Sequence, residues 1–264
     1  MSLFPSIEHK LYKITFLLNT FTKLSFSERN DENCGGDVKK RITGFLEDCY
    51  GMQNHNYPQV PISLSRKDEG VQFIYTKDSA MVRINRNAYH SFGASLLPEA
   101  SKLRRFVFDV LGLESVNRVE VRKISVFPMK IKSEGFDISN LRDYMGRILS
   151  EKILSLTTID EVASVQGAVA PFTLHQMEDY DNGFRYDILI GMVKDPQRES
   201  IYNVVLDSVC FYNPEEGIAV NELERKQSEM NQSLYCLFHW SVQDHVIAVM
   251  EKGVDNGEAE TEGE

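Results

Sequence analysis

The second half of the chain contains three strand-like segments whose connections are long enough only for hairpins. They cover roughly residues 162–177, 184–194 and 200–212. Asn182-Gly183 is a typical hairpin turn, and the link between the second and third segments is also short. A parallel pair would need a crossover of a dozen or more residues. The segments therefore predict an antiparallel sheet, in which the third, apolar on both faces, is a central strand.

Helical patterns alternate with strand patterns in two cycles of similar order. The first helix of each cycle begins at Asp37 or Ser139, and each cycle reads strand, helix, strands, helix. This order predicts an α+β fold of two similar halves, with mainly antiparallel curved sheet covered by helices and a long helix over about 221–252. The expected boundaries are 1–115 for the first half, 116–252 for a second half packed on it, and 253–264 for a disordered acidic tail.

Several shorter patterns complete the expected element order. Strands are expected at 12–18, 71–75, 80–84 and 116–131, a helix from Pro98 to Leu111, and a connection over 52–66. The alternation of the long strand changes phase after Val121, which predicts a β-bulge near Arg122 or Lys123.

Composition assigns the chain to a broad class. Hydrophobic residues make up 42% of it, the ordinary balance of a globular protein, and its apolar runs are too short to span a bilayer. The first ten residues lack the pattern of a signal peptide. Four scattered cysteines without a C-x-x-C pair favour free thiols in a reducing compartment. We therefore expect a cytoplasmic protein that does not enter membranes.

Motifs for metal and cofactor binding fail at specific positions. A calcium loop starting at Asp179 would need Gly and Glu where Phe184 and Ile190 stand. His239 and His245, six residues apart on one helix, point in different directions and cannot share a metal. Neither the phosphate-binding nor the dinucleotide-binding glycine motif occurs. The sequence predicts no metal, no cofactor and no identifiable catalytic residue.

Charge is distributed unevenly along the chain. Residues 80–132 carry ten Lys and Arg against four Asp and Glu, a net charge of +6 in a chain of −10, so the remainder carries −16. Such a segment is typical either of a surface for nucleic acid, phosphorylated ligands or acidic proteins, or of side chains that meet the acidic remainder. The candidate ligand-binding residues are Arg83, Arg86, Arg104, Arg105, Arg122 and Lys123.

The end of the chain carries a motif that can be compared with a family. The segment from Leu234 to Asp244, LYCLFHWSVQD, resembles the C-terminal helix signature F-x-W-[SL]-[IV]-x-[DE] of a sporadically distributed prokaryotic family of uncharacterised proteins. Phe4-Pro5 and the segment Val119–Ile124 extend the resemblance, whereas Lys123 and Ser125 stand where that family usually has Tyr and Asn. The resemblance implies a similar order of elements and no reaction.

Three functional hypotheses remain open after these exclusions. The first is a non-enzymatic binding or interaction protein, self-associating as a homodimer through a sheet face or the basic segment. The second is a factor that binds nucleic acid or a phosphorylated ligand through the six cations. The third is an enzyme whose site assembles from distant residues, with His175 and its acidic neighbours as candidates.

Overall fold

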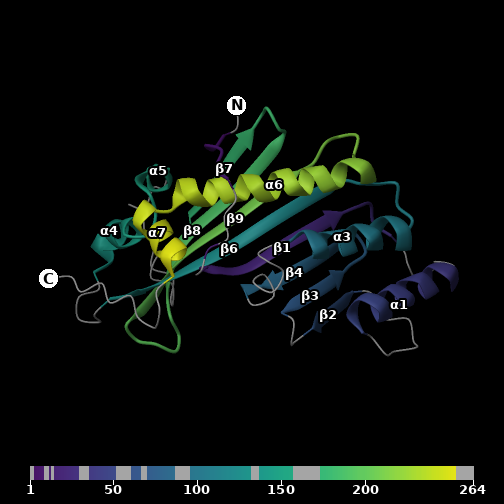
Figure 1. Ribbon diagram of the computed structural model, residues 1–264, viewed down its shortest axis with the longest axis horizontal. Helices are drawn as coiled ribbons and strands as arrows, with labels where there is room; N and C mark the ends of the chain where they lie inside the picture. Colours follow the sequence, from purple (N-terminus) through teal and green to yellow (C-terminus); the bar gives the residue numbers. More distant parts are fainter. Residues whose placement is uncertain are drawn as a thin grey trace.

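The chain folds around one large sheet with helices on one side of it (Figure 1). A computed structural model describes residues 3–8, 12, 15–29, 36–51, 61–66, 70–86, 96–131, 137–156 and 173–253. The sheet has eight strands in the order β2-β3-β4-β1-β6-β9-β8-β7, and all neighbours are antiparallel. The α+β class, the antiparallel sheet and a long C-terminal helix are thus confirmed. Within the described ranges, no helix is both long and apolar enough to cross a membrane.

Each half of the chain contributes four strands to this sheet. The first half contains β1 (Leu17–Ser25), α1 (Gly36–Tyr50), β2 (Ile62–Arg66), β3 (Val71–Tyr75), β4 (Ser79–Asn85), α3 (Leu97–Arg105), the π-helical turn η2 (Phe106–Val110) and β5 (Ser115–Val116). The second contains β6 (Arg118–Lys130), η4 (Ile138–Asn140), α4 (Leu141–Gly146), α5 (Glu151–Leu154), β7 (Thr173–Asp179), β8 (Phe184–Lys194), β9 (Ile201–Tyr212), β10 (Ile218–Ala219), α6 (Val220–Ser241) and α7 (Asp244–Lys252).

The two halves repeat one topology. In each, a first strand leads through helical segments into a three-stranded meander, whose last strand returns beside the first. The first strands, β1 and β6, pair with each other at the centre of the sheet. A short pair, β5 with β10, lies outside it.

The main core lies between the sheet and its helices. Helix α6 contacts β6 and β9, and α3 contacts β4. Strand residues that point toward the helices, such as Val121 and Phe127, are buried, whereas Arg122 and Ile124 between them are only half-buried. Burial of alternate residues on each strand therefore distinguishes a helix-covered face from an open face on the other side of the sheet.

An aromatic cluster fills the core of the first half. Phe106 has no exposed area. The centroid of its ring lies 5.0 Å from the ring centroids of Phe45, Phe73 and Tyr75. Phe45 belongs to α1, whereas Phe73 and Tyr75 belong to β3. The Phe106 ring therefore connects the helix layer to the sheet. Burial of such rings contributes the largest apolar areas to a core.

Hairpin signals located two strands of the second half closely. The first expected strand, 162–177, lies largely outside the described residues, and β7 is described from Thr173 to Asp179. β8 spans the expected residues and β9 begins one residue later than expected. Gly183 adopts a φ of 69°, the left-handed conformation that this tight turn requires. β9 pairs with both β6 and β8 and is therefore an interior strand, as its apolar pattern predicts.

The first strand was placed too early in the chain by its pattern. β1 covers Leu17–Ser25 instead of 12–18, and β2 lies within the segment expected to be a connection. Polar residues obscured β1, because Thr20 and Thr22 point into the core and are completely buried there. Their hydroxyls are satisfied by the Arg122 carbonyl and the Gln227 side chain, respectively.

The predicted bulge in the long strand is also wrong. β6 pairs with β9 without interruption from Val119 to Lys130, and the register shift lies in β1 between Leu17 and Asn19. The apparent change of phase in β6 arises because Lys123 and Ser125 occupy positions that face the helices. Polar residues at inward positions thus imitated an extra residue in the strand.

The expected C-terminal helix is divided into two. α6 ends at Ser241 and α7 starts at Asp244, because Val242 is extended and forms an isolated bridge with Leu149. The side-chain amide of Gln243 donates to the carbonyls of Gly146 and Leu149, which holds the break against α4. The acidic tail lies beyond the described residues.

The N-terminal segment packs along α6. Phe4 is buried with its ring centroid 5.3 Å from Tyr186 and 5.6 Å from Trp240, and Gln232 donates to the Ile7 carbonyl. Further along, the Tyr12 hydroxyl lies 3.0 Å from that of Tyr235 and is hydrogen-bonded to His239. Burial raises the pKa of Tyr12, so this hydroxyl stays protonated. The segment therefore fastens the start of the chain to its last long helix.

Candidate functional site

The open face of the sheet is centred on an aromatic ring between two guanidinium groups. Phe21 of β1 pairs with Arg83 of β4 on one side and with Arg122 of β6 on the other. The guanidinium carbons lie 5.6 and 5.5 Å from the centroid of the ring, within the range of cation–π attraction. Two of the six predicted ligand-binding residues, Arg83 and Arg122, therefore share this face, across three adjacent strands.

The two arginines beside Phe21 differ in how their charges are compensated. Arg122 binds Asp207 of β9 through two hydrogen bonds, Nε to Oδ1 at 2.8 Å and Nη2 to Oδ2 at 2.5 Å. This bond to Asp207 raises the pKa of Arg122. Arg83 donates only to the neutral amide of Asn19, at 2.9 Å. No carboxylate in the described part of the chain pairs with Arg83, so its charge remains available for an anion.

Other outward residues of β1–β4 continue this pattern. Lys23 lies diagonally across from Arg83, and its directly opposite residue on β6, Glu120, forms its ion pair with Arg118. Along β2, β3 and β4, the described outward side chains contain no carboxylate; beyond Ser79 at the start of β4, they are Ser63, Gln72, Ile74, Met81, Arg83 and Asn85. We call these six residues with Asn19, Phe21 and Lys23 the basic half of the open face.

The second half of the open face carries an aliphatic surface. Five of its half-buried outward side chains are those of Val126, Leu189, Val193, Val205 and Val209, which we call the aliphatic half. Two cations of this half have acidic partners: Arg118 binds Glu120 at 3.0 Å and Arg185 binds Glu178 at 3.1 Å. Asp187, opposite Val209, accepts a hydrogen bond from the Gln176 side chain at 3.1 Å. Arg118 also lies 4.2 Å from the ring centroid of Phe211.

The other predicted cations lie away from Phe21. Arg104 of α3 donates to the Gln227 side chain of α6 at 2.7 Å and pairs with Glu224 at 3.4 Å, and burial lowers its pKa. Arg105 points toward α1 and lies 3.9 Å from Asp48. Arg86 is exposed directly after β4. The basic segment of the sequence therefore does not form one surface patch.

Lys123 lies on the opposite face of the sheet from Arg122. It pairs with Thr20 of β1 and Ser208 of β9, both buried beneath the helix layer. Desolvation by burial lowers the pKa of Lys123 to about 8. This lysine therefore cannot join an interface on the open face.

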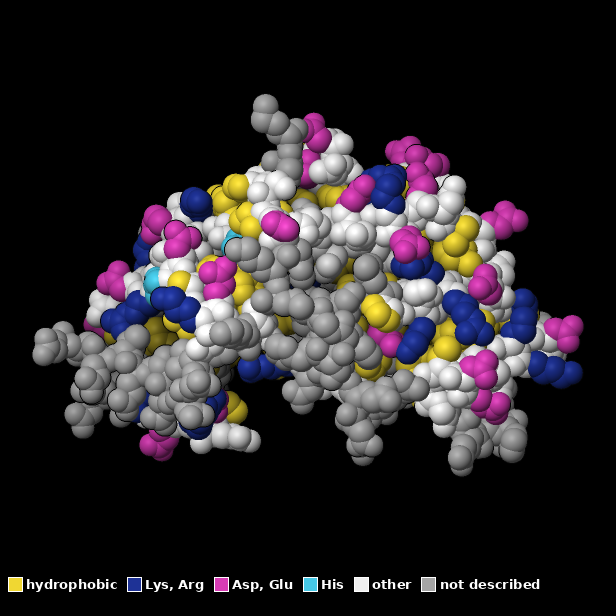
Figure 2. Space-filling model, in the orientation of Figure 1, with side chains coloured by type: hydrophobic (Ala, Val, Ile, Leu, Met, Phe, Trp, Pro, Cys, Tyr) yellow, Lys and Arg dark blue, Asp and Glu magenta, His cyan; other side chains and the backbone are white. Residues whose placement is uncertain are grey.

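The described residues on the helix side of the molecule carry charges of both signs. Figure 2 shows that Lys and Arg side chains are interspersed there with Asp and Glu. Arg225 illustrates the mixture, because it lies 2.8 Å from Glu229 and 3.9 Å from Glu222 on the same helix. Pairs of this kind solvate a helix surface and contribute little to stability or recognition.

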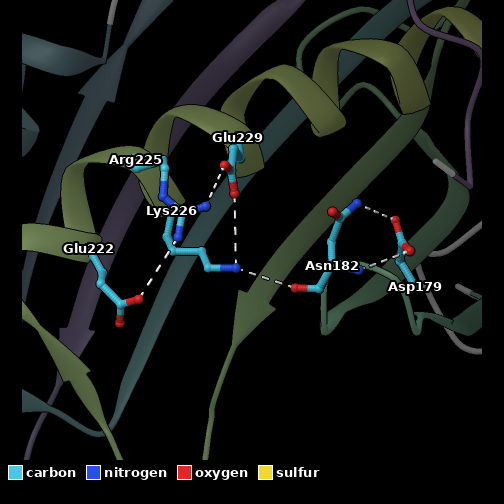
Figure 3. A network of polar contacts seen from close by, with 6 residues as sticks. All are labelled: Asp179, Asn182, Glu222, Arg225, Lys226 and Glu229. Atoms are coloured by element: carbon cyan, nitrogen blue, oxygen red, sulfur yellow. Dashed lines mark hydrogen bonds and ion pairs between the residues drawn. The ribbon is translucent and has the colours of Figure 1, made fainter. Parts of the chain in front are cut away.

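In the acidic hairpin named as a catalytic candidate, Asp179 and Asn182 bond to each other and stabilise the turn (Figure 3). Asp179 accepts hydrogen bonds from the backbone of Asp181 and Asn182 and from the Asn182 side chain, which shapes the turn. Lys226 of α6 contacts the Asn182 carbonyl at 3.5 Å and lies 4.2 Å from the Tyr212 ring centroid. These contacts attach the turn to the helix layer.

His175 does not join the acidic residues of this hairpin. It occupies an inward position of β7, whereas Glu178 is outward and exposed. Burial lowers the pKa of His175, and its Nε2 has no hydrogen-bond partner. Across the described ranges, no group of three His, Cys, Asp or Glu side chains is placed to hold a metal ion.

Sequence reasoning missed Phe21, Lys23 and Asp207 in the candidate site. The first two escaped notice because the strand was placed before residue 19. The signal that could have identified them is the run from Thr20 to Leu24, where Thr20, Thr22 and Leu24 alternate with Phe21 and Lys23. Asp207 required the pairing of β6 with β9, which a single sequence does not specify.

Comparisons with known proteins identify no family. No family model matches the chain, and no curated protein matches it. A solved structure described as "KH domains" is similar over 87% of this chain at 9% sequence identity, with a TM-score of 0.18. The match spans 63% of that other chain, less than two thirds of its length. A TM-score this low carries no argument about fold or function.

Proposed function

We propose that the chain is a non-enzymatic binding protein that holds single-stranded nucleic acid on the basic half of its open face. The observation that carries the proposal is Arg83, a cation beside the half-buried ring of Phe21 with which no carboxylate of the described residues pairs. Nucleic acid single strands bind through phosphate contacts to cations and through stacking on aromatic or guanidinium planes. The neighbouring Gln72, Ser63 and Asn85 add neutral hydrogen-bonding groups.

Two cations can contact one strand of phosphates on this surface. Lys23 and Arg83 are diagonal neighbours across β1 and β4, which places their Cα atoms roughly 7–8 Å apart. The net charge of −10 does not oppose such binding, because charges beyond a Debye length of about 10 Å at 0.1 M salt are largely screened. The local surface therefore determines which ligand approaches.

The test is a polarisation assay with a fluorescein-labelled single-stranded RNA of mixed sequence. Two phosphate contacts predict that affinity falls about sevenfold when salt rises roughly fourfold. The double variant Lys23→Gln, Arg83→Gln is expected to bind about thirtyfold more weakly, because each of the two cations contributes on the order of 1 kcal/mol. Arg185→Gln, an exposed arginine paired with Glu178, is the matched control and should bind normally. No binding by the wild-type protein at low salt, or equal losses in both variants, refutes the proposal.

A homodimer through the aliphatic half is the second part of the proposal. Five aliphatic side chains remain half-buried there, and the nearby Arg122 and Arg185 are paired with carboxylates of the same chain. Such a surface can bury apolar area against its own copy. Light scattering of the wild-type protein measures the mass directly.

The remaining proposals concern location and relatives. We place the protein in the cytoplasm, which the buried free thiols of Cys49, Cys210 and Cys236 support. We also propose membership of the uncharacterised prokaryotic family whose helix signature it resembles. Phe238 stacks on Phe127 and Trp240 packs on Phe4, so both aromatic residues of that motif contribute to packing in this fold.

A further inference from the structure

The two arginines that flank Phe21 are held through different parts of their guanidinium groups. Arg122 donates from Nε and Nη2 to the carboxylate of Asp207, so one edge of the group is occupied and its charge is neutralised. Arg83 donates from Nε alone, to the side chain of Asn19. Within the described residues, neither Nη atom of Arg83 forms a hydrogen bond or an ion pair. Arg122 therefore presents a neutralised group, whereas Arg83 presents a charged fork with two free nitrogen atoms.

The guanidinium of Arg122 is a flat surface with a fixed orientation. Its two bonds to the carboxylate fix the plane of the group, and its central carbon lies 5.5 Å from the ring centroid of Phe21. The carboxylate occupies an edge of the group and not its faces, and 43% of the Arg122 side chain stays exposed. Nucleobases stack on guanidinium planes as they do on aromatic rings. A base can therefore stack on Arg122 without breaking its bonds to Asp207.

Two apolar side chains border this plane. Val209 lies directly opposite Arg122 on β9, and Ile124 is the next outward residue along β6; both are half-buried. On the other side of Arg122, the outward Glu120 is engaged by Arg118 at 3.0 Å. Apolar neighbours contact a base but donate no hydrogen bond to its edge. Selection at this position therefore depends on stacking area, which is larger for purines than for pyrimidines.

The free nitrogen atoms of Arg83 lie on the other side of Phe21. Arg83, Phe21 and Arg122 pair directly across β4, β1 and β6, so the three residues form one row across the open face. The strands of the two arginines are two strand spacings apart, about 9.5 Å. This separation is comparable with the length of one nucleotide, from its phosphate to the far side of its base. A guanidinium with two free nitrogen atoms binds a phosphate through two parallel hydrogen bonds.

We propose that this row binds one purine nucleotide of a single strand, with the base stacked on Arg122 and the phosphate bound by Arg83. The inference rests on the proposed binding of single-stranded nucleic acid and names the unit that the surface recognises. Phe21 positions both guanidinium groups, since their carbon atoms lie 5.5 and 5.6 Å from its ring centroid. Adenine and guanine should bind alike, because Val209 and Ile124 cannot distinguish their hydrogen-bonding edges.

The experiment separates the contact with the base from the contact with the phosphate. Three fluorescein-labelled octamers carry the same number of phosphates: one of adenine nucleotides, one of uracil nucleotides, and one of abasic sugar-phosphate units. Their affinities for the full-length protein are measured by polarisation at low salt. We expect the adenine octamer to bind at least about fivefold more tightly than the abasic octamer, because stacking of one base contributes about 1 kcal/mol or more. The uracil octamer should lie between them.

Two variants should change the two contacts separately. Arg122→Lys keeps a positive charge beside Asp207 but removes the plane, so the adenine and abasic octamers should bind about equally. Arg83→Gln removes the phosphate contact: the preference for adenine should remain, while the slope of log affinity against log salt falls by about 0.7. Arg118→Lys is the matched control, because Arg118 also pairs with a carboxylate and lies over a ring, that of Phe211. It should keep the wild-type preference.

Three results would overturn the assignment. Equal binding of all three octamers, with affinity still falling as salt rises, would remove the base contact and leave the proposed function intact. An Arg122→Lys variant that is folded by circular dichroism and keeps the preference for adenine would place the base elsewhere, as would loss of that preference in Arg118→Lys. Absence of binding by any octamer would instead refute the proposed function itself, and this inference with it.

Discussion

The two halves of the sheet share a topology but have different outward surfaces. Each half returns the last strand of a meander beside its first strand, and β1 and β6 join the halves at the centre. On the first half, Arg83 binds only a neutral amide, whereas on the second half Arg122 is neutralised by Asp207. A basic stretch of sequence thus becomes a basic surface only where the fold leaves its cations without acidic partners.

The largest expected effect is a loss of stability that distinguishes the core of the first half from that of the second. Phe106→Ala should lower the free energy of unfolding by about 3–5 kcal/mol, because it removes a fully buried ring that contacts three other aromatic residues. We expect amide hydrogen exchange to accelerate mainly in β3 and β4. Phe127→Ala, at a comparably buried position on the central β6, should instead affect both halves. Uniform exchange across the sheet in Phe106→Ala would show that the halves open as one unit.

A smaller effect tests the charge difference directly. Asp207→Asn removes the carboxylate that neutralises Arg122 and should cost about 1–2 kcal/mol in urea denaturation, since Asp207 is buried but Arg122 is partly exposed. The freed guanidinium should also tighten RNA binding several-fold, which would make the second half resemble the first. Glu178→Gln breaks an exposed pair and is expected to change stability by less than about 0.5 kcal/mol. If the Asp207→Asn variant binds RNA with unchanged affinity, neutralisation of Arg122 by Asp207 does not limit RNA binding.

The last prediction concerns the aliphatic half, where the expected effect is on assembly and hardly on stability. Val205→Glu places a charge on the surface proposed for the homodimer and should give a monomer by light scattering, while RNA binding stays intact. The fold should lose less than about 1 kcal/mol, because the side chain is outward and half-buried. Ser63→Glu on the basic half is the matched control and should leave the mass unchanged. A monomeric wild-type protein at micromolar concentration contradicts the dimer.

Local signals in the sequence predicted the elements whose geometry is decided locally. Asn182-Gly183 located β8 because a tight turn requires the left-handed conformation that Gly183 adopts. β1 could not be located in this way, since Thr20 and Thr22 are stabilised inside the core by partners from β6 and α6. The break after α6 likewise depends on contacts with Leu149 and Gly146, about a hundred residues earlier.

The candidate site was predictable only in part for the same reason. A sequence shows Arg83 and Arg122 as cations, and their common face follows once β1 pairs with both their strands. The partner of each cation cannot be read from its own segment, because Asp207 is 85 residues from Arg122 and Gln227 is 123 residues from Arg104. Lys123 was assigned to the same group as Arg122, although adjacent strand residues point to opposite faces.

The packing of the N-terminal segment against α6 has a consequence for synthesis of the protein on the ribosome. Tyr12 meets His239, a residue 227 positions later in the chain, and Phe4 meets Trp240. Translation produces about 5–20 residues per second, so the first residues emerge many seconds before their partners. During that interval the Phe4 ring has none of its final neighbours on α6. Chaperones that recognise exposed aromatic residues would therefore have their longest opportunity at the start of this chain.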